Sequence, residues 1–416
     1  MLTRHTQITT VNVGAVNTTA VIAEVDGEGR AGLLGYGQCA SAGLSDDLIT
    51  DIRELGGVIG ECVGQAEEMA QQSSGPLVMA IGGEHVRILS GRGGLLLDPG
   101  EGQNRSRNIT RQDIKKSLEK AGKVVLAMDL ELLHVLPVNF LVDGRRVKNP
   151  EGIGGSRLDV EVLLVAARQT IMRSLEKAAE FGGYRVRTFC YRPLATSRAV
   201  LSGEELERGA CLIDIGGRHT DVALFRENRL LFSSTLALGG NSITSDTGQL
   251  LAISQQEAEK IKLKYGYCGT LDGEDLKFQL SGVGGDGALW RLVRKSALGA
   301  GVIQPRVEEI LDESLAAMKG FLGHEEWSGC AALTGGTSQL PGIRGLAQAR
   351  LPFPFNNGRN LVFENLDEQS SQPEYATAMG LVAYDMEQRL NRREEVRDNP
   401  ISRWCDKVIR RIHTVL

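Results

Sequence analysis

Asp214-Ile215-Gly216-Gly217-Arg218-His219-Thr220-Asp221 is the stretch of sequence that decides the fold. Apolar runs lead into it from 210 and out of it to 225, so the sequence predicts a strand, a glycine-rich turn and a second strand. Glycine lets backbone N–H groups approach a phosphate because it has no Cβ to stand in the way. The stretch therefore predicts a phosphate-binding hairpin, and an ordinary β-turn is the alternative for this motif taken alone.

A similar hairpin lies near the N-terminus. Residues 8–13 and 19–25 are strand-like runs rich in β-branched side chains, and they flank Gly14-Ala15-Val16-Asn17. Each hairpin is followed by a third strand-like run, at 32–36 and at 229–237, which is an internal duplication in outline. Two glycine-containing turns roughly 200 residues apart suggest two loops that face one anion.

The rest of the chain alternates between helical and strand-like patterns, which is typical of an α/β protein. We predict helices at 47–71, 169–182, 255–264, 304–322 and 374–384, and strands at 77–81, 160–166, 185–191 and 331–333. Between 83 and 158 the pattern changes to short strands, a polar loop at 98–108 and a helix capped by Thr110 with Asp113 three residues later. This stretch predicts a small inserted α+β unit, so the first domain is discontinuous in sequence.

The composition excludes several classes of protein. A length of 416 residues predicts about two to four domains, and no run of about 20 apolar residues could span a bilayer. The first ten residues hold no signal-peptide core, so we expect a cytoplasmic protein. The net charge of −5, without basic stretches interleaved with aromatics, argues against nucleic acid as a partner. The seven cysteines form no Cys-x-x-Cys pair, and we expect reduced thiols.

Positive charge is concentrated at the C-terminus. Residues 386–416 hold eight Arg or Lys against five Asp or Glu, a net +3 in a chain of net −5. Within them, 386–399 is charged and nearly free of apolar residues, which predicts a linker.

The last residues, 400–416, predict an amphipathic helix that starts at Asn399-Pro400. The apolar positions recur at helical spacing and share one face: Ile401, Trp404, Cys405, Val408, Ile409, Ile412, Val415 and Leu416. The basic positions on the other faces are Arg403, Lys407, Arg410 and Arg411. An apolar stripe beside basic residues suits an anionic lipid surface, so we expect a membrane-binding helix. A helix that docks on its own body is the alternative.

Several motifs follow one another in a distinctive order. They are the hairpin at Val13-Gly14, the motif at 214–221, Gly239-Gly240-Asn241, the helix from Glu257 to Lys262 with Tyr265-Gly266, and the run from Leu333-Thr334-Gly335-Gly336-Thr337 to Gly342. This order resembles the actin-like ATPase superfamily. Leu133-His134-Val135-Leu136-Pro137, Val142-Asp143-Gly144 and Asn149-Pro150 resemble the small subdomain peculiar to the FtsA family of bacterial cell-division proteins. The similarity runs along essentially the whole chain.

The resemblance implies an α/β, actin-like (ribonuclease H-like) fold with two lobes, an inserted small α+β subdomain and a C-terminal amphipathic helix. The implied divisions are 1–82 with 159–200 for the first lobe (subdomain 1A), 83–158 for the inserted subdomain (1C), 201–243 with 330–385 for subdomain 2A, 244–329 for subdomain 2B, 386–399 for the linker and 400–416 for the membrane-targeting helix.

By the same resemblance, ATP lies between the two lobes. The implied contacts are Asn12, Gly14, Ala15, Asn17, Asp214, Gly216, Gly217, Arg218 and His219 for the phosphates, Gly335, Gly336 and Thr337 for the adenosine, Glu259 and Lys262 for the ribose, and Gly239, Gly240 and Asn241 beside them. Residues 259 and 262 are three apart on a predicted helix and share a face, although an exposed ion pair has the same spacing.

The chain departs from the family pattern in both phosphate loops. The first loop of the family usually carries Asp-x-Gly-Thr/Ser-x-Lys, whereas this chain has Asn12, Ala15 and Asn17. Arg218 and His219 replace a glycine and a hydroxyl residue, and Arg192 stands where many members have a water-orienting glutamate. The resemblance implies ATP with Mg²⁺, but the lost carboxylate and lysine make the metal site doubtful and predict slow or absent hydrolysis, with no catalytic residue. Arg218 is a substitute cation for the phosphates.

The implied function is that of an actin-like cell-division protein. Such a protein binds ATP, polymerises into filaments and tethers FtsZ filaments through the C-terminal peptide of FtsZ, with other division proteins as further partners. The resemblance implies a peripheral protein on the cytoplasmic face of the inner membrane at the division site. A type IV pilus-type assembly adaptor of the same fold is the alternative. Such an adaptor is not expected to carry the terminal amphipathic helix, so that helix distinguishes the two functions. Asn12 with Arg192 argues against a sugar kinase, and the short stretch after Thr337 argues against a chaperone.

Overall fold

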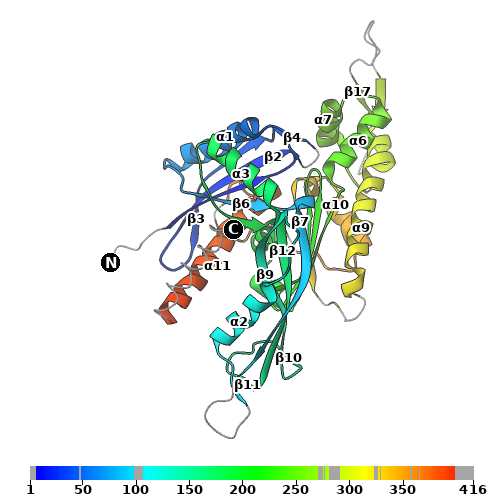
Figure 1. The fold of residues 1–416 in the computed structure, drawn as a ribbon. Helices are drawn as coiled ribbons and strands as arrows, with labels where there is room; N and C mark the ends of the chain where they lie inside the picture. The colour runs from blue at the N-terminus through cyan, green and yellow to red at the C-terminus, as the bar shows by residue number, and fades with distance from the viewer. Residues whose placement is uncertain are drawn as a thin grey trace.

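The computed structural model describes residues 6–45, 48–97, 106–269, 275, 277–280, 291–322, 327, 329–356, 358–364 and 366–398. Within these residues the chain forms three main sheets, one in each of two lobes and one in an insertion that extends away from them (Figure 1). The predicted two-lobed α/β architecture with an inserted α+β unit is therefore confirmed.

The first lobe is built on a five-stranded sheet in the order β13-β6-β1-β2-β3. Its strands are β1 (Thr6–Val13), β2 (Asn17–Val25), β3 (Ala31–Ala40), β6 (Leu77–Ile81) and β13 (Val186–Tyr191). β1 and β2 pair antiparallel, as the hairpin pattern predicts, whereas β6 runs parallel to both β1 and β13. α1 (Ile52–Ala70) with α3 (Gln169–Phe181) covers one face, and α11 (Ala376–Asp398) with α4 (Arg192–Val200) covers the other. Because both faces are covered, β6 is buried at every residue.

The second lobe repeats the same hairpin in a four-stranded sheet of order β16-β15-β14-β19. The strands are β14 (Ala210–Ile215), β15 (Thr220–Arg226), β16 (Arg229–Leu236) and β19 (Cys330–Thr334). The long helix α9 (Gln304–Leu322) packs on β15 and β16. The remaining elements of this lobe are α5 (Gly203–Arg208), α6 (Gly240–Leu251), α7 (Gln255–Tyr265), β17 (Lys277–Leu280), β18 (Arg291–Arg294), α8 (Lys295–Leu298) and α10 (Ile343–Arg350). The duplication predicted from the two glycine-containing hairpins is confirmed.

The insertion forms a third sheet in the order β10-β9-β12-β7, with α2 (Arg111–Gly122) packed on it. Its strands are β7 (Val86–Leu96), β9 (Leu130–Val142), β10 (Arg145–Val147) and β12 (Arg157–Arg168), and β8 (Arg107–Asn108) pairs with β11 (Gly154–Gly155) beside them. The predicted cap of α2 is confirmed. The backbone N–H of Asp113 donates to Thr110 Oγ1 at 3.3 Å, and the backbone N–H of Thr110 donates to Asp113 Oδ2 at 2.9 Å.

One predicted strand lies in a different sheet from the one expected. The sequence places a strand at 160–166 after the insertion, in the first lobe. β12 instead pairs with β7 and β9 along its whole length, so the predicted boundary between 158 and 159 cuts a single strand. A short apolar run indicates a strand but does not show which strands it pairs with.

α11 is longer than the predicted helix at 374–384. It continues to Asp398, so the segment predicted as a linker, 386–399, is helical as far as Asp398. α11 crosses α4 closely, because a Cβ on Gly380 would lie only 1.9 Å from the carbonyl oxygen of Ala195. The predicted membrane helix at 400–416 lies outside the described residues. Among those that are described, no helix combines the length and the apolar composition needed to cross a bilayer.

Candidate functional site

A cleft of about 780 Å³ lies between the two lobes. It is lined by the glycine turn at 14–17 in the first lobe and the glycine turn at 216–219 in the second. The N-terminus of α6, one face of α7 and the loop after β19 complete the lining. The residues predicted to contact nucleotide that line this cleft are Asn12, Gly14, Ala15, Asn17, Asp214, Gly216, Gly217, Arg218, His219, Gly240, Asn241, Glu259, Lys262, Gly335, Gly336 and Thr337. Only Gly239 of the predicted set is outside the lining.

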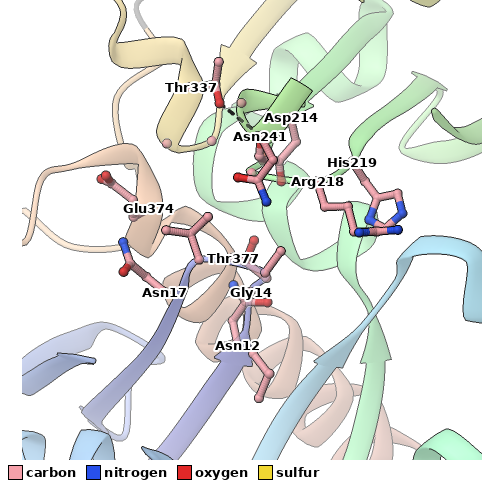
Figure 2. Close-up of a pocket in the computed structure, with 18 of the residues that line it drawn as sticks. Asn12, Gly14, Asn17, Asp214, Arg218, His219, Asn241, Thr337, Glu374 and Thr377 are labelled. Atoms are coloured by element: carbon pink, nitrogen blue, oxygen red, sulfur yellow. Dashed lines mark hydrogen bonds between the residues drawn. The ribbon is translucent and has the colours of Figure 1, made fainter. Parts of the chain in front are cut away.

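The two glycine turns face each other across the cleft (Figure 2). Each turn is closed by its own backbone: the N–H of Gly14 donates to Asn17 O at 3.1 Å, and the N–H of Gly216 donates to His219 O at 2.9 Å. A Cβ on Gly217 would lie 2.5 Å from Cγ2 of Val16. The turn of the first lobe therefore lies directly against the turn of the second, and a side chain larger than hydrogen at Gly217 would separate them.

The second turn is fastened to the elements behind it. The N–H of Gly240, at the start of α6, donates to Gly216 O at 2.9 Å, and Thr337 Oγ1 donates to the same oxygen at 3.0 Å. A Cβ on Gly239 would lie 2.7 Å from the carbonyl oxygens of both Gly216 and Gly217. Gly239 therefore packs directly against the backbone of the turn. This is why it belongs to the motif although it does not line the cleft.

Glu259 and Lys262 lie inside the cleft and not on an exposed helix face. Lys262 Nζ lies 2.7 Å from Glu259 Oε2, and it donates to Gly240 O at 3.2 Å and to Thr244 Oγ1 at 2.9 Å. Only 6% of Lys262 is exposed. The pair therefore joins α7 to the beginning of α6 beside the cleft.

Two buried carboxylates lie at the floor of the site: Asp214 lines the cleft, and Asp221 is buried outside the lining. Burial, and then the charge of Asp221, raise the pKa of Asp214 to about 6, while Arg192 and a hydrogen bond from Thr196 lower it. That hydrogen bond runs from Thr196 Oγ1 to Asp214 Oδ2 at 3.2 Å. Asp221 lies 3.4 Å from Arg192, measured from Oδ2 to Nη1, and its Oδ1 accepts from Thr235 at 2.6 Å. One guanidinium thus compensates two neighbouring carboxylates.

The residues of this floor do not fit a divalent cation bound directly by the chain. Asp214 has one oxygen bonded to Thr196, and its other oxygen would lie 2.4 Å from a Cβ on Gly335. Asn12, which stands in place of the family carboxylate, is neutral, and its buried Oδ1 has no hydrogen-bond partner among the described residues. No group of three His, Cys, Asp or Glu side chains in the described residues could hold a metal ion.

Sequence reasoning missed several residues of the cleft. Gly82 and Gly83 line it directly after β6, and Gly83 has a positive φ of 72°. Thr377, at the beginning of α11, and Glu374, in the short 3-10 turn Pro373–Tyr375 before it, also line the cleft. Glu374 Oε1 accepts from Gln339 Nε2 at 2.6 Å. A glycine pair after a buried strand is the same signal that marks the turn at Gly216-Gly217 and could have found Gly82-Gly83. Glu374 and Thr377 carry no such local signal.

Solved structures share this fold. A chain of the PilM-PilN type IV pilus biogenesis complex superposes with a TM-score of 0.63, at 17% identity, over 92% of this chain and 99% of that one. MreB5 of Spiroplasma citri bound to ADP superposes with a TM-score of 0.54, at 11% identity, over 94% and 98% of the two chains. At these identities the likeness shows the fold alone, and it confirms the predicted actin-like fold.

Sequence comparisons identify the family. Residues 211–380 match the family model described as cell division protein FtsA, and residues 96–166 match the SHS2 domain inserted in FtsA. Cell division protein FtsA of Neisseria meningitidis is 30% identical over 90% of this chain and 89% of its own length. The FtsA of Bacillus subtilis is 30% identical over 90% and 82%, and that of Escherichia coli 28% over 93% and 92%. With this similarity along nearly all of its length, the chain belongs to the FtsA family of bacterial cell-division proteins.

Proposed function

We propose that this chain binds ATP in the cleft between its lobes, assembles into filaments and tethers FtsZ filaments to the cytoplasmic face of the membrane at the division site. The contact of Val16 with Gly217 is the observation that carries ATP binding, because it brings the two glycine turns to one point. Backbone N–H groups of glycine turns and of a helix N-terminus suit phosphate. The divisions of the chain into subdomains remain part of this proposal, apart from the limit between 158 and 159, which cuts β12, and the linker at 386–399, which is helical as far as Asp398.

The same site supports binding better than turnover. Phosphoryl transfer depends on a metal, a phosphate-binding cation and a residue that orients the attacking water. In this cleft Asn12 replaces the carboxylate, Asn17 replaces the lysine and Arg192 replaces the water-orienting glutamate. We propose slow or absent hydrolysis. Calorimetric titration with ATP tests binding, and phosphate release at several per minute would contradict slow turnover.

The proposed membrane anchor is the segment 400–416. Each basic residue near an anionic leaflet contributes about 1 kcal/mol, so a single such helix binds reversibly. Many copies held in one filament raise the effective concentration of the anchor at the surface. Vesicle flotation tests this: a chain that ends at Asn399 should remain folded and lose flotation. Ile412→Asp should weaken lipid binding, whereas Arg410→Ala should matter mainly on anionic vesicles at low salt.

The flotation has two outcomes against the anchor. Undiminished flotation of the truncated chain would refute the proposed anchor at 400–416. Unfolding on truncation would show that the last residues dock on the body.

The proposed FtsZ-binding surface lies on the second lobe, within 244–329. The candidate cations within it are Arg291, Arg294, Lys295 and Arg306. Arg306 is engaged with Asp246, 2.6 Å from Nε to Oδ2, and Lys295 lies over the ring of Tyr267. Within the described part of the chain, Arg294 makes a long pair with Asp275, at 4.0 Å, and its side chain is 67% exposed. We therefore expect Arg294 to contribute most to binding an acidic peptide. Unchanged binding of an FtsZ that lacks its C-terminal peptide would rule this surface out.

A further inference from the structure

Arg192 is a cation of the cleft that joins the two lobes. It is the first residue of α4, directly after β13 of the first lobe, and its guanidinium reaches Asp221 on β15 of the second lobe. The backbone of Gly82 lies against the guanidinium, because a Cβ there would come within 3.0 Å of both Cζ and Nε of Arg192. Arg192 is therefore held between the two lobes at the floor of the cleft.

The guanidinium of Arg192 does not make all the hydrogen bonds that its N–H groups could donate. Its distance of 3.4 Å from Asp221 is longer than the 2.7–2.9 Å or so of a charge-assisted hydrogen bond. Its buried Nε has no hydrogen-bond partner among the described residues. Lys262 differs in this respect, because its ammonium contacts Glu259, Thr244 and a backbone carbonyl. The buried Nε, packed against Gly82, is not accessible to a ligand, so the exposed 21% of the side chain, which lines the cleft, is the part that a ligand can reach.

The carboxylates of the floor are already occupied. Asp221 is 1% exposed and is bonded to Thr235 on one oxygen, with Arg192 at the other. Asp214 is 8% exposed, with Thr196 on one oxygen and the backbone at Gly335 close to the other. A divalent cation would have to displace Arg192 or Thr196 to reach either carboxylate.

We propose that Arg192 is a built-in cation for the phosphates, so that this chain binds ATP without a divalent metal ion. The inference rests on the proposed binding of ATP in the same cleft. A guanidinium keeps its charge at every physiological pH, and its planar set of N–H donors matches phosphate oxygens. A divalent ion normally neutralises part of the triphosphate charge. Here Arg192, which also faces Asp214 and Asp221, supplies a positive charge and N–H donors in place of that ion.

Calorimetric titration of the purified full-length chain with ATP tests the proposal, once with excess EDTA and once with excess Mg²⁺. The dissociation constants in the two conditions should agree within about threefold, a difference below 1 kcal/mol. Arg192→Gln should lose about ten- to hundredfold in affinity in EDTA, the range expected when hydrogen bonds to a charged group are removed. Arg192→Lys keeps the charge but not the fork of donors, and it should lose less than the glutamine variant.

Arg198→Gln is the matched control. Arg198 lies on the same helix, but its Nε pairs with Glu387 at 2.9 Å, and it does not line the cleft. This variant should bind ATP as the natural chain does in both conditions. Thermal melting of each variant shows whether it is folded, and the comparison of EDTA with Mg²⁺ in the natural chain decides the proposal even if Arg192→Gln does not fold.

The outcomes are distinct. ATP binding that appears only with Mg²⁺ overturns the metal-free proposal and leaves the proposed function intact. Binding by folded Arg192→Gln that equals the natural chain in EDTA overturns the role of Arg192. An absence of binding in both conditions overturns ATP binding itself and the proposal with it.

Discussion

Nε2 of His134 accepts a hydrogen bond from the backbone N–H of Tyr191 at 3.0 Å. His134 belongs to β9 of the insertion, and Tyr191 is the last residue of β13 in the first lobe, directly before Arg192. On the other side of the ring, Nδ1 lies 3.4 Å from the hydroxyl of Tyr384 on α11. One imidazole therefore connects the insertion to the strand that ends at the cleft and to the last described helix.

We expect His134→Leu to lower the free energy of unfolding by about 1–3 kcal/mol at pH 7.5, because the buried N–H of Tyr191 loses its acceptor. Burial lowers the pKa of His134 to about 4, so the unfolded chain binds more protons between about pH 4 and the usual histidine value near 6.5. The stability that His134 contributes is then lost as the pH falls through this window. Urea unfolding at pH 5 and 7.5 should show a smaller pH effect in the variant.

Tyr384→Phe is the control for His134. It removes the hydroxyl that lies 3.4 Å from Nδ1 of His134 and leaves the acceptor of the Tyr191 N–H in place, so it should cost less than the His134 variant and keep the pH dependence. Equal losses in the two variants would show that the hydrogen bond to Tyr191 has no special weight.

Asp214 is expected to have the opposite pH dependence. Its pKa is raised from 3.8 to about 6, so the folded chain binds more protons in that range and loses stability as the pH rises through it. Asp214→Asn removes the buried charge and should raise the free energy of unfolding at pH 7.5 by up to about 3 kcal/mol, with little gain at pH 4. The same urea titrations measure it. A gain that is equal at both pH values would contradict the assignment to Asp214.

Gly336→Asp should abolish ATP binding. The glycine lines the cleft, and a Cβ there would lie 3.4 Å from Cγ of Glu374, so the new carboxylate would face both the nucleotide and an existing negative charge. Gly345→Asp, on α10, is the control, because nothing lies within 4 Å of a Cβ at that position. Calorimetric titration with ATP should show binding by the control and none by the cleft variant.

The crossing of α4 and α11 can be tested with two glycines. Gly380→Ala should lower the thermal midpoint and cost at least about 1–3 kcal/mol, because the new methyl group would lie 1.9 Å from Ala195 O unless the helices separate. Gly64→Ala, inside α1 with nothing within 4 Å of its Cβ, should stabilise the chain by about 0.5–1 kcal/mol. A stabilising effect at both positions would show that α4 and α11 can separate at little cost in free energy.

The sequence was sufficient to predict the turns and helix starts that depend on residues close together in the chain. Glycines between apolar runs predict the hairpins at Gly14 and Gly216, and Thr110 with Asp113 predicts the start of α2, because turn and cap geometry depend on neighbouring residues. The sheet to which β12 belongs depends on pairing with distant strands, so the sequence could not supply it.

The contacts of individual side chains with distant residues could not be predicted from the sequence. His134 lies in a motif that indicated the insertion, but nothing near it predicts a bond to Tyr191, 57 residues away. Glu374 and Thr377 line the cleft because the turn at Pro373–Tyr375 and the start of α11 lie there, and the sequence underestimated the length of α11. A charged segment with few apolar residues predicts a linker by composition, although it continues a helix that is already packed at its other end.

The close fit of Gly380 against Ala195 holds the N-terminal part of α11 on α4. One end of the helix is fixed beside the cleft, where Thr377 Oγ1 lies 2.9 Å from Thr196 Oγ1. The 23 residues of α11 rise about 1.5 Å each, so its far end stands about 35 Å away. A tilt of only 10° or so at the fixed end would move that far end by about 6 Å at this length. A small rearrangement around the cleft would thus be magnified at the point from which residues 400–416 depart.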